Sequence, residues 1–94
     1  MIQSIEDGAG NPAGTRPKAV WTLRSKRCLQ AELKRRGVTY AELARRLTEM
    51  GVPESEGSVT VKINRGTFPV WFFLAALHAI GRRRIRIDDV VSGS

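Results

Sequence analysis

The sequence predicts a compact all-α domain of four to five helices, and three observations lead to this prediction. Apolar residues recur every three or four positions in successive segments, as they do on the buried face of an α-helix. Capping residues precede three of these segments, and glycines follow four of them, at positions 37, 51, 66 and 81. A chain of 94 residues has room for one domain with one core.

The first helix is expected at about residues 18–36, with Pro17 at its start, where a missing backbone N–H costs least. Gly37 follows its last turn and is expected to end it. The apolar stripe of this helix consists of Val20, Trp21, Cys28, Leu29 and Leu33.

The second helix has the clearest start signal in the sequence. Thr39 as N-cap and Glu42 three residues later form a capping box, and Val38 suits a hydrophobic staple with Leu43. The helix is expected to end near Met50. Its buried side is predicted to consist of Ala41, Leu43, Ala44 and Leu47.

The third helix is predicted against β propensity, which alone would favour a strand around Val59 and Ile63. These two residues are four apart, and Ser55 can cap a helix at about residues 55–64. A fourth, almost wholly apolar helix is expected at residues 69–80, with Thr67 as its N-cap. After it, the alternation of Arg and Ile at residues 84–87 predicts a short C-terminal strand.

The ends of the chain and its cysteine content bound the domain and its compartment. Residues 1–17 contain three glycines and two prolines without apolar periodicity, so we expect a disordered leader before a folded domain at residues 18–91. The single cysteine, Cys28, excludes an intrachain disulfide. No signal peptide is evident, and the longest apolar stretch is shorter than the ~20 residues that cross a bilayer. We therefore expect a cytoplasmic protein without membrane contact.

No group of residues in the sequence predicts catalysis. His78 is the only histidine and has no carboxylate or cysteine at ligand spacing. The adjacent carboxylates Asp88 and Asp89 are typical of a solvated turn. Glycines at residues 8–14 lack the strand and helix that flank a phosphate-binding loop. We predict that the protein is not an enzyme and has neither a metal site nor a cofactor.

The charge balance indicates a polyanionic partner or a solubilising surface. Sixteen Lys and Arg residues stand against nine Asp and Glu residues, which gives a net charge of +7. Most of the basic residues are arginine, whose planar fork suits phosphate groups and base edges. The basic cluster at residues 82–86 fits either a phosphate clamp or a solvated strand edge.

The order of a basic helix, a capped helix, a turn, a short polar helix and an apolar helix resembles the Cro/repressor type of helix-turn-helix domain. The resemblance covers roughly residues 26–87 and rests on TYAELARRL at residues 39–47, on Val59, Ile63, Asn64 and Gly66, and on Pro69 and the apolar helix that ends at Gly81. More narrowly, LQAELKRRGVTYAELARRLTEMGV followed by KINRGTF is similar to an uncharacterised family of small bacterial domains of about this fold. The resemblance implies a small bacterial transcriptional regulator.

In a helix-turn-helix protein, the recognition helix presents its outward residues to the major groove. The resemblance assigns this role to residues 55–65 and implies double-stranded DNA as the partner. Thr60 and Val61 can contact a thymine methyl group, Glu56 can accept a hydrogen bond from cytosine, and residues at the groove edges meet phosphates. The implied interface consists of Tyr40, Glu56, Gly57, Ser58, Thr60, Val61, Lys62, Asn64 and Arg65.

Two departures from this pattern keep other functions open. The connection at residues 48–54 is longer than the usual tight turn, and the outward face has no Arg, Gln or Asn at the base-reading positions. One alternative is a nucleic-acid binder of low specificity, including an RNA binder that acts by charge alone. The other is a protein-interaction adaptor in which the apolar fourth helix and residues 48–54 contact a partner.

The fourth helix offers more apolar surface than a core this small can cover, and the predicted strand has no partner within one chain. These two features predict a homodimer through the fourth helix and the C-terminal strand. A two-fold dimer would set its recognition helices about 34 Å apart, one turn of DNA. The alternative is a monomer in which Trp71 packs on Trp21.

Overall fold

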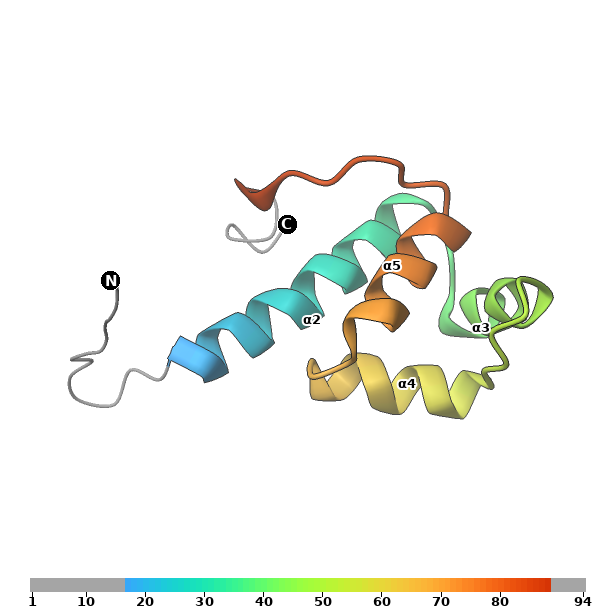
Figure 1. Cartoon of the computed structure of the whole chain (residues 1–94), viewed down its shortest axis with the longest axis horizontal. Helices are drawn as coiled ribbons and strands as arrows, with labels where there is room; N and C mark the ends of the chain where they lie inside the picture. The colour runs from blue at the N-terminus through green and yellow to red at the C-terminus, as the bar shows by residue number, and fades with distance from the viewer. Residues whose placement is uncertain (1–16, 89–94) are drawn as a thin grey trace.

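The computed structural model describes residues 17–88, which form four α-helices around one core (Figure 1). The helices are α2 (Pro17–Arg35), α3 (Tyr40–Glu49), α4 (Glu56–Arg65) and α5 (Val70–Ala79). The predicted all-α class is confirmed for this part of the chain. The expected leader at residues 1–17 lies outside the described residues, except for Pro17 at the start of α2.

The core joins all four helices. Helix α3 packs against α4 and α5, and α2 contacts both of these helices as well. Phe72 of α5 is the largest of the fully buried side chains. The other core residues are Leu29, Leu33, Val38, Leu43, Ala44, Leu47, Val59, Ile63, Ala76, Leu77 and Ile80. Among residues 17–88, no helix combines the length and the apolar character that crossing a bilayer requires.

The first turns of α2 contribute little to this core. The apolar stripe predicted for the helix is buried at Cys28, Leu29 and Leu33, whereas Trp21 is 47% exposed. In Figure 1 the N-terminal turns of α2 extend past the other helices, which explains this exposure. Trp71 is also half-exposed and meets Phe72 edge-on, with ring centroids 6.0 Å apart.

Local capping explains where α3 and α4 begin. The Thr39 hydroxyl accepts from the backbone N–H of Glu42 at 3.1 Å, as the sequence predicts. At α4 the Ser55 hydroxyl accepts from the N–H of Ser58, and the Ser58 hydroxyl accepts from the N–H of Ser55. This reciprocal cap supports the predicted helix against the β propensity of its residues.

Three predictions about the helices are wrong in detail. Ala41 is exposed, so the buried side of α3 is narrower than predicted. The Glu42 carboxylate binds Arg45 and Arg46, and α3 therefore has only the Thr39 half of the predicted capping box. The N-cap of α5 is Pro69 and not the predicted Thr67, because the Pro69 carbonyl accepts from the N–H groups of Phe72 and Phe73.

The predicted C-terminal strand is also absent from the described residues. Residues 82–86 form an irregular segment, and a helical turn begins at Ile87. Ile85 packs against the core, whereas Ile87 is 71% exposed. The alternation of Arg and Ile therefore belongs to an irregular segment. One of its isoleucines, Ile85, packs on the helices, and the segment pairs with no strand within the described residues.

A buried carboxylate holds this segment in place. Glu32 of α2 has no exposed surface, and its Oε2 accepts from Nη1 of Arg35 at 2.6 Å. Its other oxygen lies 3.6 Å from Nε of Arg82 in the C-terminal segment. A buried carboxylate is costly unless it is paired, so the two arginines stabilise this end of the core.

Two further arginines bind the end of α5. Arg46 donates to the carbonyl of Ala79 at 3.2 Å, and Arg36 donates to that of Ile80 at 3.3 Å. Carbonyls at a helix C-terminus have no partner within the helix and favour nearby cations. Glu42 accepts from Nε of Arg46 at 2.8 Å and so orients this contact. Hydrogen bonds from Arg45 and Arg46 lower the pKa of Glu42 from 4.5 to about 2.

This pKa shift predicts a pH dependence of stability. Folding lowers the pKa of Glu42, so the ionised carboxylate stabilises the folded state. This contribution to the free energy of unfolding is complete above pH 4.5 and is lost as the pH falls through about 2. We expect the wild type to melt at a higher temperature than Glu42→Gln above pH 4.5, with the difference vanishing near pH 2. Thermal melts across this range measure it, and a carboxyl NMR titration with a midpoint near 4.5 in the folded protein would contradict it.

Gly66 ends α4 where this helix comes closest to α2. Its φ is +69°, in the left-handed region that glycine adopts at low cost. A Cβ at this position would lie 2.6 Å from the carbonyl oxygen of Thr22 and 3.2 Å from the Cβ of Lys26. The two helices can therefore approach this closely only because residue 66 has no side chain.

We expect Gly66→Ala to destabilise the fold by about 3 kcal/mol, from backbone strain and from the collision with α2. Gly37→Ala is the matched control, because Gly37 has a φ of +67° but no atom within 4 Å of an added Cβ. Strain alone predicts a loss of about 1 kcal/mol at that position. Urea unfolding of both variants measures the difference in the free energy of unfolding. If both variants lose the same free energy, the contact with α2 does not restrict the side chain at residue 66.

Candidate nucleic-acid interface

The predicted interface residues on α4 lie on a helix whose other side is in the core. Val59 and Ile63 are fully buried. Ser58, Thr60 and Lys62 are half-buried, and the exposed predicted residues are Glu56, Gly57, Val61, Asn64 and Arg65. Tyr40, at the start of α3, is half-buried, and its hydroxyl accepts from Gln30 at 3.1 Å.

Hydroxyl groups on α4 are partly occupied by local hydrogen bonds. Ser58 caps the helix and also donates to Oε1 of Glu54 at 2.5 Å. The Thr60 hydroxyl donates to the carbonyl of Glu56 at 2.8 Å, which leaves its oxygen as an acceptor. Val61 is 49% exposed and presents the largest apolar contact on this face of the helix.

Lys62 is held within the protein. Its Nζ lies 3.1 Å from Oε1 of Glu54, whose side chain is only 4% exposed, and 5.8 Å from the ring centroid of Phe72. A phosphate at Lys62 would have to compete with a nearly buried carboxylate. Helical spacing could not indicate this pair, because Glu54 precedes the helix and lies eight residues away.

Ion pairs divide the basic residues into two groups. Those that pair with a carboxylate of residues 17–88 are Arg35, Arg45, Arg46, Lys62, Arg82 and Arg86. The remaining described ones, which have no such partner, are Lys18, Arg24, Lys26, Arg27, Lys34, Arg36, Arg65, Arg83 and Arg84. An external anion at this second group does not compete with a carboxylate of residues 17–88.

Three cations of the second group meet at one groove. Lys18 and Lys26 of α2 and Arg65 of α4 line it together with Asn64, and its floor includes Leu23. The groove has a volume of about 490 Å³ and lies beside the contact of Gly66 with α2. Sequence analysis predicted Asn64 and Arg65 for the interface but missed Lys18 and Lys26. The only sequence signal for this groove was the glycine at residue 66, which allows a close approach of two helices. A glycine alone does not show which helix it approaches.

The arrangement favours anions at the C-terminal end of α4. Lysine and arginine side chains with one amide around a groove suit the oxygens of successive phosphates. The other end of α4 carries Glu56, which is exposed and has no ion pair within the described residues. Within residues 17–88, no three His, Cys, Asp or Glu side chains are grouped as a metal site would require.

Comparison with known proteins adds a family but no function. No curated protein and no solved structure matches the chain. Residues 21–85 match the model of a family described as a domain of unknown function, DUF6471. This region contains α3, α4 and α5 and most of α2, and it covers more than half of the chain. The chain therefore belongs to the DUF6471 family of domains of unknown function.

Proposed function

We propose that this protein is a DNA-binding domain of the helix-turn-helix kind, in which α3 and α4 form the motif. The observation that carries the proposal is the groove beside α4, where Lys18, Lys26 and Arg65 gather without carboxylate partners among residues 17–88. A duplex that follows this groove brings its phosphates to the three cations and its bases to the exposed side of α4.

The connection between α3 and α4 supports this arrangement despite its length. The Thr48 hydroxyl donates to the carbonyl of Glu54 at 3.0 Å and accepts from the N–H of the same residue at 3.2 Å. The backbone N–H of Val52 donates to the carbonyl of Leu47 at 2.9 Å. These bonds fix the path of the turn, so α4 is held at one orientation to α3.

The expected specificity is low. Bidentate base contacts come from Arg, Lys, Asn and Gln, whereas the exposed residues in the first turns of α4 are Glu56, Gly57 and Val61. Contacts to phosphates therefore provide most of the binding free energy. Val61→Ala should change the ratio of affinities between duplexes more than it changes the mean affinity.

We expect the affinity for duplex DNA to fall steeply with salt. If about five phosphates are neutralised, the slope of log K against log salt concentration is about −4 to −5. Fluorescence anisotropy with a labelled random duplex at several salt concentrations measures this slope. Absence of binding at low salt would refute the proposed function.

The cations of the groove should determine this slope. Lys26→Ala and Arg65→Ala are each expected to reduce its magnitude by about 1 and to weaken binding equally on different sequences. Lys34→Ala is the matched control, because Lys34 is an exposed lysine in the last turn of the same helix as Lys26. Lys62→Ala should affect the slope less than Arg65→Ala, since Lys62 pairs with Glu54. Equal effects of Lys34→Ala and Lys26→Ala would exclude the groove as the phosphate site.

A further inference from the structure

Helix α5 has an apolar face that no described part of the chain covers. Val70 is 72% exposed, Trp71 51% and Leu74 58%, and the helix contains no Lys, Arg, Asp or Glu. Large apolar side chains that are exposed together are uncommon on monomeric proteins and mark interaction surfaces.

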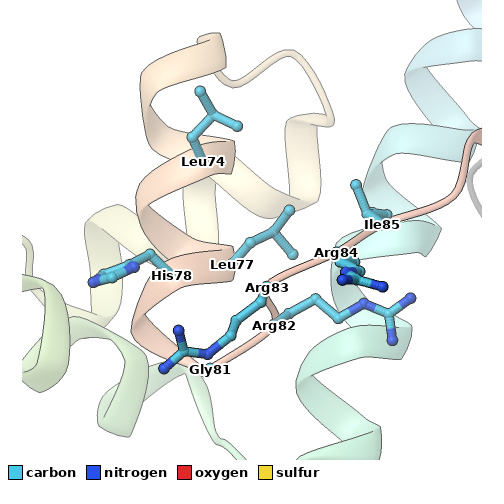
Figure 2. Close-up of a pocket in the computed structure, with 8 residues that line it drawn as sticks. All are labelled: Leu74, Leu77, His78, Gly81, Arg82, Arg83, Arg84 and Ile85. Atoms are coloured by element: carbon cyan, nitrogen blue, oxygen red, sulfur yellow. The ribbon is translucent and has the colours of Figure 1, made fainter.

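This face continues into a groove between α5 and the C-terminal segment. The groove has a volume of about 410 Å³ and is lined by Leu74, Leu77, His78 and residues 81–85. Figure 2 shows Leu77 and Ile85 pointing toward one another from the two sides. The groove therefore has apolar side chains on both sides, from α5 and from the C-terminal segment.

Two arginines make the rim of the groove cationic. Arg83 and Arg84 are exposed and have no carboxylate partner within residues 17–88, whereas Arg82 beside them pairs with the buried Glu32. Charge-assisted pairs between arginine and carboxylate are the stronger hydrogen bonds at a protein surface. A ligand for this groove therefore combines apolar side chains with carboxylates.

We propose that the groove between α5 and residues 81–85 docks an acidic amphipathic helix of another protein. The apolar side of that helix contacts Leu74 and Ile85, and its carboxylates pair with Arg83 and Arg84. Apolar side chains at helical spacing, flanked by charge, are a recurrent way for a helix to bind in a groove. This proposal is independent of DNA binding.

The charges favour such a partner over a second copy of this chain. Glu32, Glu42, Glu49, Glu54 and Asp88 already have ion pairs, which leaves Glu56 of α4 as the unpaired carboxylate of residues 17–88. A second copy that docks by the same face brings Arg83 and Arg84 toward the partner's arginines, and like charges across an interface are unfavourable. Each copy also has a net charge of +7.

The proposed docking site is separate from the proposed DNA site. In Figure 1 the C-terminal segment and α4 lie on opposite sides of α2. The residues of the two grooves do not overlap, since one involves Lys18, Lys26 and Arg65 and the other residues 74–85. The two proposed sites therefore share no residue.

The test uses two synthetic amphipathic peptides that share a leucine face and differ only in their polar residues, which are Glu in one and Lys in the other. We expect the full chain to bind the Glu peptide with a Kd of about 10 µM and the Lys peptide at least about tenfold more weakly. The double substitution Arg83→Glu and Arg84→Glu should reverse this preference. Leu74→Asp should weaken binding of the Glu peptide by about tenfold and leave the melting temperature unchanged, because Leu74 is exposed.

Controls separate this site from a general attraction of acidic peptides to a basic protein. Lys26→Ala and Arg65→Ala should leave the affinity for the Glu peptide unchanged. If these variants weaken it as much as the α5 variants do, or if both peptides bind equally, the proposal is wrong. Light scattering provides a second readout: a dimer that Leu74→Asp converts to a monomer would identify a second copy as the occupant and overturn the proposal.

Discussion

The end of α4 lies against the backbone of α2 because residue 66 has no side chain, and this contact joins two of the helices that form the core. With a Cβ at that position only 2.6 Å from the carbonyl of Thr22, the two helices would have to separate. Their approach buries Val59 and Ile63 of α4 and leaves the first turns of α2 beside Arg65. The packing of α4 on α2 and the proposed phosphate groove therefore share this one close approach.

The fold divides the basic residues into those that bind groups within the protein and those that are accessible to an external anion. Arg36, directly after α2, and Arg46 of α3 bind the C-terminal carbonyls of α5. Lys62 and Arg82 neutralise carboxylates that are almost inaccessible to water. These cations contribute to stability and are poor candidates for binding DNA. Of the other cations, Lys18, Lys26 and Arg65 line one groove, and Arg83 and Arg84 line the other.

The local structure could be predicted from the sequence to a considerable extent, because its causes lie within a few residues. Thr39 and Ser55 cap the helices that they precede, as predicted. The glycines at 37, 51, 66 and 81 follow the four helices and have positive φ values. Pairs between distant residues could not be predicted in this way. The approach of Lys18 and Lys26 to Arg65 and the ion pair of Arg82 with Glu32 depend on tertiary packing, which helical periodicity does not encode.

The errors have two origins, one in tertiary packing and one in a neighbouring residue. Alternating Arg and Ile residues predict a strand when a neighbouring strand is present, but here Ile85 packs on helices and the backbone finds no ladder. Thr67 is a good capping residue by composition, yet Pro69 fixes its own backbone at a φ of −69° and accepts the first hydrogen bonds of α5. In both cases a local preference gave way to a packing arrangement or to a more rigid neighbour.

The pair formed by Glu32 and Arg82 extends the folding unit beyond α5. Removal of the chain after α5 would leave a fully buried carboxylate with Arg35 as its single cation and would uncover the side of the core on which Ile85 packs. The smallest independently folding fragment must therefore include residues 80–85, although these residues contribute no helix or strand. The last helix is not the boundary of this domain, and truncation designs based on helix ends alone would cut through its core.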